Sequence, residues 1–221
     1  MRKIIVTTFI SMDGVLQAPG GPEEDRTNSF KWGGWMFPHG DDVTDKAIAE
    51  LMHQPFDLLL GRRTYEIFAA YWPYQENHPV AEKFNSIGKY VVSSQSPDLS
   101  WENSTLITGD VVEGIKKLKQ QDGPNLLVHG SGKLVQTLLQ HNLIDELHTW
   151  IHPITLGGGK KLFEEGTQPA NWKLTNSIVA STGVIIASYV PDGDVKLGSF
   201  VADDPSEKEK ARRERIERGQ W

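Results

Sequence analysis

Two short glycine-containing segments combine residue types that bind phosphate. The first comprises Gly61, Arg62, Arg63 and Thr64, and the second comprises Gly130, Ser131, Gly132 and Lys133. A glycine turn that opens a helix presents free backbone N–H groups and the positive end of the helix dipole, and both favour an anion. The alternative is that each glycine is present only to allow a positive φ angle or close packing, without a ligand. Two such turns at the carboxyl ends of strands in one α/β sheet indicate a dinucleotide that lies across that edge.

The dinucleotide fingerprint of Rossmann folds is incomplete in this chain. Gly130 and Gly132 lack a third glycine, and no acidic residue ends the next strand to bind a ribose hydroxyl. Arg62 and Arg63 instead suit an additional 2′-phosphate, because a guanidinium group meets phosphate with two N–H donors. The alternative is that both arginines point to solvent or pair with Glu66.

Other catalytic chemistries have weaker support. His148 and His152 share one side of a predicted strand but stand ~13 Å apart, too far for one zinc ion. The chain has no cysteine, which excludes disulfides, thiolate metal sites and a cysteine nucleophile. Ser131 lacks the glycine spacing of a nucleophile elbow, and residues 157–161 lack the Ser or Thr of a Walker A motif. We therefore expect no metal site and no catalytic triad.

The elements that must position these segments alternate between strand and helix patterns. Strands are predicted at residues 3–10, 56–60, 89–93, 105–107, 125–129 and 146–152. Helices are predicted to begin at Thr44 or Asp45, after residue 64, at Asp110 and after Gly130. Residues 172–180 and 184–190 are two further β runs joined by a short turn, which predicts an antiparallel hairpin. The predicted fold class is α/β, with a mixed, mostly parallel sheet that ends in a C-terminal antiparallel hairpin.

A long segment, residues 14–42, separates the first predicted strand from the first predicted helix. Glycine and proline interrupt any periodicity, while Trp32, Trp35 and Phe37 add apolar bulk. Loops of this length in a compact domain are typically functional or disordered, and the aromatic residues favour a functional loop. Three roles are open for these aromatic side chains: a hydrophobic lid, a dimer contact, or a surface that stacks against a flat ligand. Trp35 and Phe37 are the candidate substrate-binding residues.

Composition limits the partners that the chain can have. It has 23 basic and 29 acidic residues, a formal net charge of −6, which is unlike the charge of a nucleic-acid binder. The N-terminal apolar run, residues 4–10, is too short for a membrane span and lacks a signal-peptide cleavage site. We expect a cytoplasmic protein with neither nucleic-acid nor membrane partners. The apolar hairpin and the aromatic loop predict a homodimer.

Five motifs, in this order, resemble the dihydrofolate reductase superfamily. They are S-M-D-G (residues 11–14), L-L-L-G-R-R-T-Y-E (58–66), K-Y-V-V-S-S-Q (89–95), L-L-V-H-G-S-G-K-L (126–134) and G-G-G-K-K-L-F (157–163). The first and last are most similar to stand-alone relatives of the reductase domain of the bifunctional riboflavin-biosynthesis deaminase–reductase. The resemblance covers about residues 3–190 and implies a three-layer α/β/α domain around a mixed eight-stranded sheet. We therefore predict a reductase domain over residues 1–192 and a C-terminal extension, residues 193–221, that is a peripheral helix or a mobile tail.

The resemblance implies hydride transfer from NADPH to a small pteridine- or pyrimidine-like heterocycle. By motif position, the cofactor site comprises Gly61, Arg62, Arg63, Thr64, Ser93, Ser94, Gly130, Ser131, Gly132 and Lys133. In that site the serine pair would help Arg62 bind the 2′-phosphate. The two glycine junctions would hold the remaining phosphates from opposite sides.

Two carboxylates are candidates for a catalytic role. Asp45 matches the spacing at which dihydrofolate reductases carry a carboxylate ahead of the G-R-x-T strand, and its alternative role is to stabilise the first turn of a helix. Asp13 is the second candidate, and its alternative role is to form a turn. The cofactor carries the hydride, so no residue here is compulsory for the chemistry. A non-catalytic protein that binds a nucleotide or a flat ligand on the same fold is therefore the alternative function.

Overall fold

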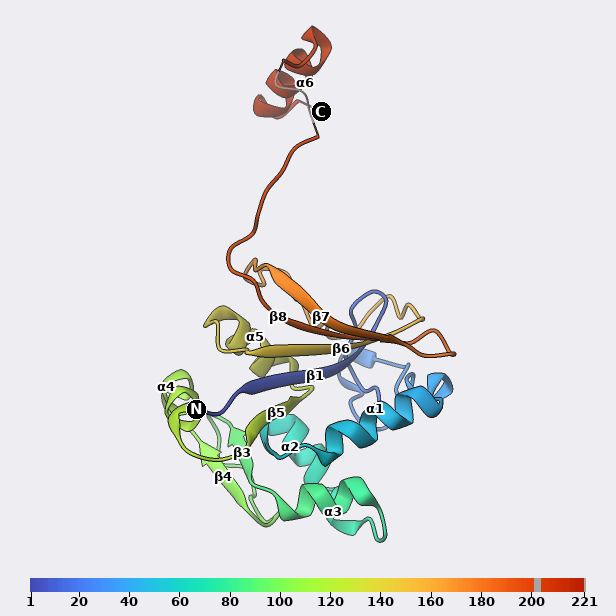
Figure 1. The fold of residues 1–221 in the computed structure, drawn as a ribbon, viewed down its shortest axis with the longest axis vertical. Helices are drawn as coiled ribbons and strands as arrows, with labels where there is room; N and C mark the ends of the chain where they lie inside the picture. The colour runs from blue at the N-terminus through green and yellow to red at the C-terminus, as the bar shows by residue number, and fades with distance from the viewer. Residues whose placement is uncertain (201–203, 221) are drawn as a thin grey trace.

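An eight-stranded sheet forms the centre of the computed structural model, which describes residues 1–200 and 204–220 (Figure 1). Its strand order is β4-β3-β2-β5-β1-β6-β8-β7. The strands are β1 (Ile4–Ser11), β2 (Phe56–Gly61), β3 (Lys89–Val92), β4 (Ser104–Ile107), β5 (Asn125–His129), β6 (Glu146–His152), β7 (Trp172–Val179) and β8 (Ile185–Pro191). Strands β1 to β6 pair in parallel, whereas β8 is antiparallel to β6 and to β7. The predicted mixed sheet with a C-terminal hairpin is confirmed.

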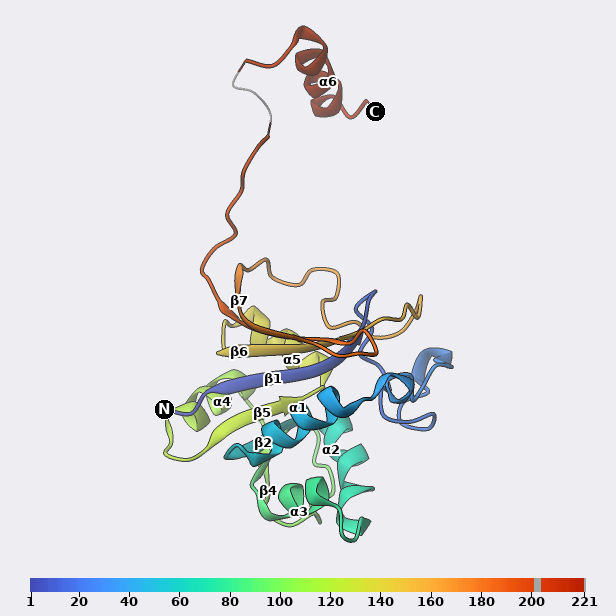
Figure 2. The ribbon, with the colours of Figure 1, turned by 45° about the vertical axis from the view of Figure 1, so that its right-hand side comes forward.

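Helices cover both faces of the sheet and complete three layers (Figure 2). On one face lie α1 (Asp42–His53), α2 (Arg62–Ala69) and α3 (Pro79–Ser86), and on the other lie α4 (Val111–Gln120) and α5 (Gly132–Gln140). Alternation along β2 serves both layers, because Leu58 and Leu60 pack towards α2 and α3 while Leu59 packs towards α4 and α5. The central strands are therefore apolar on both sides, as buried parallel strands are.

Helix α1 begins at Asp42, two residues before the earlier of its two predicted starts. Its N-cap is Asp41, whose carboxylate accepts hydrogen bonds from the N–H groups of Val43 (3.1 Å) and Thr44 (2.9 Å). The other carboxylate oxygen of Asp41 accepts from the backbone N–H and the hydroxyl of Ser181, both at 2.7 Å. The prediction of a start at Thr44 or Asp45 was wrong because Asp41 satisfies the first N–H groups of the helix. The same contact ties the start of α1 to the β7–β8 turn.

Helix α3 was not predicted at all. Its N-cap, His78, makes no capping hydrogen bond with its side chain, and Pro79 stands in its first turn. Proline is tolerated there because the first N–H groups of a helix have no partner within it. The helix is held by tertiary packing, since Ala81 and Phe84 are buried.

The long segment between β1 and α1 is ordered around a small apolar cluster of its own. Val15, Ala18, Phe30 and Trp35 are buried together, separately from the main core. Two single-turn 3-10 helices, η1 (Thr27–Ser29) and η2 (Phe37–His39), lie in this segment, and a third, η3 (Trp72–Tyr74), follows α2. The sequence left open whether this segment is a functional loop or a disordered one. The structure shows an ordered loop with its own packed side chains.

The last element, α6 (Glu207–Glu217), stands apart from the sheet (Figures 1 and 2). None of its residues is buried, and ion pairs one turn apart, such as those of Glu209 with Arg212 and Arg213, line its surface. Over residues 1–200 and 204–220, no helix combines the length and apolar character needed to span a membrane.

Candidate cofactor and substrate site

The two glycine junctions lie side by side at the carboxyl edge of the sheet. Strand β2 pairs in parallel with β5, and β5 pairs in parallel with β1. Gly61 ends β2, and Gly130 follows β5 directly. The order in which strands are added changes direction here, because the chain runs outward from β2 to β4 and then returns to place β5 between β2 and β1. Ligands of open α/β sheets bind at such a switch point.

The hydroxyl of Ser131 joins the two junctions. It accepts a hydrogen bond from the backbone N–H of Gly61 (3.0 Å) and donates one to Oγ1 of Thr64 (2.7 Å). Ser131 adopts a left-handed conformation with φ 63° and ψ 59°, and Gly130 before it has φ 69°. Glycine adopts this conformation without steric cost, whereas a serine in it is strained unless the surroundings hold it. Because the hydroxyl is already engaged, backbone N–H groups remain as the donors that a ligand would meet.

The start of α5 leaves such donors open. The first N–H of the helical ladder belongs to Val135, which donates to the carbonyl of Ser131 (3.0 Å), so the N–H groups of the three preceding residues have no acceptor within the described chain. A Cβ atom added at Gly130 would meet no atom within 4 Å, and one at Gly132 would meet only the Leu16 side chain, at 3.6 Å. Lys133 is exposed and, among the described residues, has no ion-pair partner. This junction therefore offers open space, free N–H groups and a positive charge to an anion.

Arg62 is engaged by a neighbour on its own helix. Its Nη1 donates to both carboxylate oxygens of Glu66, at 2.7 and 2.9 Å, which is one of the arrangements the sequence left open. Arg63 is exposed. Strands β2 and β3 are neighbours, and Gly61 lies opposite Val92 in their register, so Ser93 and Ser94 follow at the same edge. That Arg62 binds a 2′-phosphate stays a prediction.

The two serines after β3 differ in exposure. Ser93 is buried, its N–H donates to the carbonyl of Ile107 (3.1 Å), and its hydroxyl accepts from the N–H of Gln95 (2.9 Å). Ser94 is exposed. Of the pair, Ser94 is therefore the one whose side chain can meet a ligand without local rearrangement.

Asp13 holds together the loops that follow β1 and β6. Its carboxylate accepts hydrogen bonds from the Ser11 hydroxyl (2.6 Å) and from the N–H groups of Leu156 (3.1 Å) and Gly157 (2.8 Å). The Ser11 hydrogen bond, followed by the backbone donors, lowers the pKa of Asp13 to about 2. Asp13 occupies a structural position in this loop pair, and its catalytic role stays a prediction.

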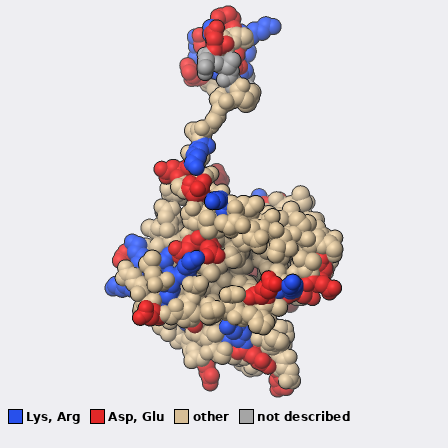
Figure 3. All heavy atoms as spheres, in the orientation of Figure 1, with Lys and Arg blue, Asp and Glu red and all other residues tan. Residues whose placement is uncertain are grey.

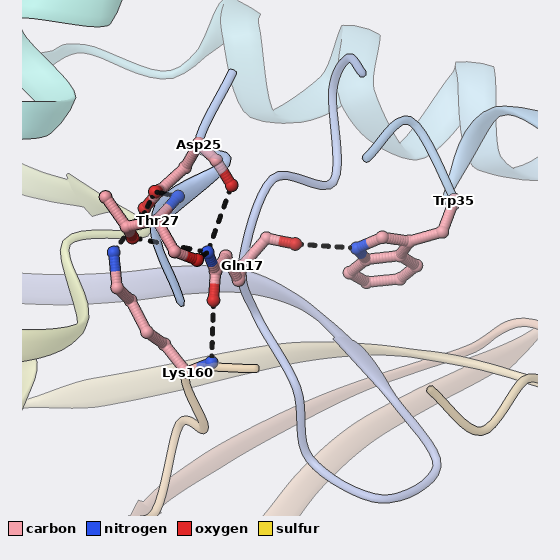
Figure 4. Close-up of polar contacts among 5 residues, drawn as sticks. All are labelled: Gln17, Asp25, Thr27, Trp35 and Lys160. Carbon is pink, nitrogen blue, oxygen red and sulfur yellow. Dashed lines mark hydrogen bonds and ion pairs between the residues drawn. The ribbon is translucent and has the colours of Figure 1, made fainter. Parts of the chain in front are cut away.

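Gln17 makes the second contact between these two loops (Figure 4). Its side-chain N–H groups donate to the carbonyls of Asp25 and Thr27, both at 3.0 Å, and its side-chain carbonyl accepts from the N–H of Lys160 (3.0 Å). An ion pair between Lys160 and Asp25 closes the network. Because Gln17 is buried, its side-chain amide needs these partners, and it links the long loop to the loop after β6.

The aromatic residues of the long loop separate into an inner and an outer set. Trp35 is 5% exposed, and its indole N–H donates to the carbonyl of Gln17 (2.8 Å). Phe37 and Trp32 are 65% and 57% exposed. Trp35 therefore stabilises the loop, whereas Phe37 presents a free face. Substrate contact by either residue stays a prediction.

His129 is a candidate residue that the sequence patterns did not single out. It ends β5, directly before Gly130, and its ring lies among Phe9, Phe68 and Phe84 at centroid distances of 5.6, 5.8 and 6.5 Å. Its Nδ1 atom is enclosed with no hydrogen-bond partner among the described residues, and burial lowers its pKa to about 4. The imidazole is thus neutral near pH 7. The signal in the sequence was its place as the last residue of a strand that runs into a glycine junction.

Asp45 lies in the first turn of α1 and is exposed. The contact between Asp41 and Ser181 places this turn beside the β7–β8 turn, which is at the carboxyl end of β6 because Ile151 of β6 pairs with Ile185 of β8. Asp45 therefore lies at the same carboxyl edge of the sheet as the glycine junctions. Both roles considered for it, catalysis and helix stabilisation, are compatible with this position. Within the described part of the chain, no three His, Asp or Glu side chains gather in a way that could hold a metal ion.

The fold and this edge define a class of protein, which structural comparison identifies as the dihydrofolate-reductase-like fold. A "putative riboflavin biosynthesis protein" from Shewanella sp. PV-4 matches with a TM-score of 0.65 at 23% identity, over 86% of this chain and 99% of that one. Dihydrofolate reductase from Enterococcus faecalis, complexed with NADP(H) and RAB-propyl, matches with a TM-score of 0.54 at 15% identity, over 86% and 96% of the two chains. A pyrimidine reductase-like protein from Corynebacterium diphtheriae matches with a TM-score of 0.57 at 14% identity, over 87% and 93%.

Sequence comparison gives the family. The model of the RibD C-terminal domain matches residues 2–186, so the chain belongs to the RibD C-terminal domain family. Two relatives from Bacillus subtilis strain 168 are the uncharacterized proteins YyaP and YwjB. YyaP is 27% identical over 193 residues, 85% of this chain and 94% of YyaP. YwjB is 25% identical over 176 residues, 78% of this chain and 89% of YwjB. The predicted resemblance is confirmed, and the chain is an oxidoreductase domain of the riboflavin-pathway reductase type.

Proposed function

We propose that the protein is an NADPH-dependent reductase that transfers a hydride to a small pteridine- or pyrimidine-like heterocycle. The observation that carries the proposal is the Ser131 hydroxyl, which links the β2 and β5 junctions and leaves the N–H groups at the start of α5 open beside them. Membership in the RibD C-terminal domain family supports the same assignment.

The chain's own residues fit a phosphorylated dinucleotide. The N–H groups at the start of α5, with Lys133, would hold the pyrophosphate, because they are open and carry the positive end of a helix dipole. Arg62 would exchange Glu66 for the 2′-phosphate, with Ser94 as a second donor at the adjoining strand end. When bound, NADPH would supply the hydride, so that the protein's contribution is to orient and desolvate the two rings.

The heterocycle would lie on the α1 side of the same edge. Phe9, Phe68 and His129 are partly exposed there, directly beside Gly130, and their mutually inclined rings would offer apolar contact to a flat ligand. A neutral imidazole can donate or accept a hydrogen bond without requiring a charged partner. We assign proton supply to Asp45, through water, and assign Asp13 to loop positioning, because three donors already engage the Asp13 carboxylate.

Two measurements test this proposal. Thermal-shift titration with NADPH and NADH should give stabilisation that is larger for NADPH. Loss of NADPH absorbance with a panel of dihydropteridines and aminopyrimidinediones should identify turnover. NADPH binding without turnover on any heterocycle would favour the alternative, a non-catalytic nucleotide-binding protein. Absence of NADPH binding would contradict the proposed reductase and would leave only a protein that binds another nucleotide or flat ligand.

The role of Asp45 has a matched control on the same helix turn. Asp42 is also an exposed carboxylate in the first turn of α1. Asp45→Asn should lower kcat and leave the Kd of NADPH unchanged, whereas Asp42→Asn should change neither. Equal kcat values in the two variants would restrict Asp45 to helix stabilisation.

A further inference from the structure

A series of aromatic side chains leads away from the Gly130 junction along α2 and η3. The ring of Phe68 lies 5.8 Å from that of His129 and 6.1 Å from that of Trp72, measured between ring centroids. Tyr71 follows, with its ring 5.0 Å from that of Trp72. Phe68 and Trp72 are partly exposed, and Tyr71 is 50% exposed. We call Phe68, Tyr71 and Trp72 the aromatic track, and it extends apolar contact beyond the ring that His129 would meet.

The charge on this side of the edge differs from the charge at the cofactor junctions. Residues 32–45, which lead into α1, and residues 64–82, which carry the aromatic track, contain no lysine or arginine. Their carboxylates include those of Asp42, Asp45, Glu76 and Glu82. In the space-filling view, acidic side chains predominate over α1 (Figure 3). The junctions, by contrast, carry Arg62, Arg63 and Lys133.

The lysines that border these two segments are engaged elsewhere. Lys46 pairs along its own helix with Glu50 (3.9 Å), and Lys83 donates to the backbone carbonyl of Gln54 (3.1 Å). The Asp41 carboxylate already accepts two of the N–H groups at the start of α1. An anionic group of a ligand would therefore meet carboxylates here without the cation and the open donors that α5 offers. Such a like-charge contact is unfavourable and discriminates against the ligand.

His129 joins the aromatic track to the carboxyl edge. Its Nδ1 atom is enclosed with no hydrogen-bond partner among the described residues, while its ring is partly exposed beside Gly130. The imidazole is neutral near pH 7, because burial lowers its pKa to about 4. His129 therefore adds a polar ring to this side of the edge without adding a positive charge.

We propose that the hydride acceptor is a heterocycle without a phosphate or other anionic group, and that it carries an aromatic substituent that lies along the aromatic track. This assignment rests on the proposed function and adds to it the chemistry of the substituent. The heterocycle would meet Phe9 and His129, with the substituent directed over Phe68 towards Tyr71. Separation by charge also fixes the orientation of the two ligands, because the dinucleotide phosphates meet cations and open N–H groups only at the junctions.

Two matched pairs of pterins test the substituent. The first pair is 6-methylpterin and 6-phenylpterin, and the second is 6-hydroxymethylpterin and its phosphate ester. Quenching of pterin fluorescence, with and without the non-fluorescent NADP⁺, gives each Kd without turnover. We expect the phenyl compound to bind roughly tenfold more tightly than the methyl compound, and the phosphate ester to bind roughly tenfold more weakly than its parent alcohol. A phosphate ester that binds as tightly as the alcohol, or a phenyl compound no tighter than the methyl compound, would overturn the proposal.

One variant of the aromatic track separates substituent binding from a general effect on the fold. Tyr71→Ser should weaken binding of 6-phenylpterin by roughly threefold or more and leave binding of 6-methylpterin unchanged. Tyr74→Ser, at another exposed tyrosine of the same turn, lies outside the series of ring contacts and should change neither Kd. Equal losses for the two pterins in Tyr71→Ser, or no loss for either, would place the substituent elsewhere. Circular dichroism of both variants verifies their fold.

Turnover separates this proposal from the proposed function. NADPH oxidation is measured with the 7,8-dihydro forms of the same four pterins. If the pterins rank as expected in binding but none of them oxidises NADPH, the reductase assignment fails and the assignment of the aromatic track stands. If NADPH is oxidised and the phosphate ester is the preferred substrate, the reductase assignment stands and the aromatic track is not the substituent site.

Discussion

Two pairs of loops occupy the same carboxyl edge of the sheet and differ in how they use their polar groups. The loops after β1 and β6 bond to each other through Asp13 and Gln17, and Gly159 packs so closely that an added Cβ would stand 2.7 Å from Val15. The turns after β2 and β5 share a single hydroxyl, that of Ser131. The first pair is closed, whereas the second leaves donors open in front of α5.

This difference shows why similar residue types perform different tasks. Both regions contain glycines and lysines, and glycine-rich sequence alone therefore does not locate a phosphate site. In the closed pair the polar groups find their partners within the two loops themselves, so the bonds stabilise the fold. In the open pair the donors have no partner in the described chain, so a ligand can supply one. We therefore expect the closed pair to determine mainly stability and the open pair to determine ligand affinity.

The largest effect on stability is expected at Gln17. Gln17→Leu would leave the Asp25 carbonyl and the Lys160 N–H without their Gln17 partner, while the Thr27 carbonyl would keep only the long bond from the N–H of Phe30 (3.4 Å). We expect the free energy of unfolding to fall by about 3 kcal/mol, since each group left unpaired in this part-buried network costs about 1–3 kcal/mol. Urea denaturation measures it, with the exposed Gln140→Leu as control. A loss equal to that of the control would mean that the network adds nothing to stability.

Acid should weaken the two regions in separate pH windows. His129 has a pKa of about 4, lowered from 6.5 by burial, so the unfolded chain binds a proton that the folded chain does not. Stability should therefore fall as pH falls from 6.5 to 4, by up to about 3 kcal/mol. Asp13, with a pKa lowered from 3.8 to about 2, contributes stability above 3.8 that is lost as pH falls towards 2.

Two substitutions test which residue causes the loss of stability in each pH window. His129→Phe should remove the upper window, and Asp13→Asn should remove the lower one, in urea titrations repeated at each pH. His141→Phe, at an exposed position, is the control. Persistence of the upper window in the His129 variant would show that another group causes it.

Ligand affinity should respond at the open junction and not at the closed one. Gly132→Val places a branched side chain where the backbone must approach phosphate, while its Cβ meets only Leu16 at 3.6 Å. We expect a folded protein with NADPH affinity reduced roughly tenfold or more. Gly158→Val, where an added Cβ meets nothing within 4 Å, should leave the affinity unchanged. If both variants bind NADPH like the parent, the phosphates lie elsewhere.

The smallest expected effect concerns cofactor preference. Arg62→Ala should cost roughly tenfold or more in NADPH affinity and little in NADH affinity, because a charge-assisted bond to the 2′-phosphate contributes about 1.5–3 kcal/mol. Glu66→Gln should preserve or strengthen NADPH binding, since the Glu66 carboxylate competes for the same guanidinium. Titration of both cofactors into the three proteins measures the ratio. An unchanged ratio in Arg62→Ala would exclude Arg62 from reading the 2′-phosphate.

The sequence by itself determined the strands, most helices and the position of both glycine junctions. Periodicity and turn chemistry act over a few residues, so residues 56–60 and 125–129 could be recognised as strands, and Gly61 and Gly130 as their ends. The order of five motifs was also sufficient for the family. Helix α3 was missed because its amphipathic stripe is short and its start has no side-chain cap.

Only the tertiary structure decided which of these residues meet. The Ser131 hydroxyl reaches Gly61 across 70 positions of sequence, and Gln17 reaches Lys160 across 143. The same holds for Asp41, whose contact with Ser181 ties the start of α1 to the β7–β8 turn, and for His129, whose ring is enclosed by rings from three other elements. A short window of sequence specifies which donors and acceptors a side chain has, but not which residues they will bond to. Those partners arrive only when the sheet closes and brings distant loops to one edge.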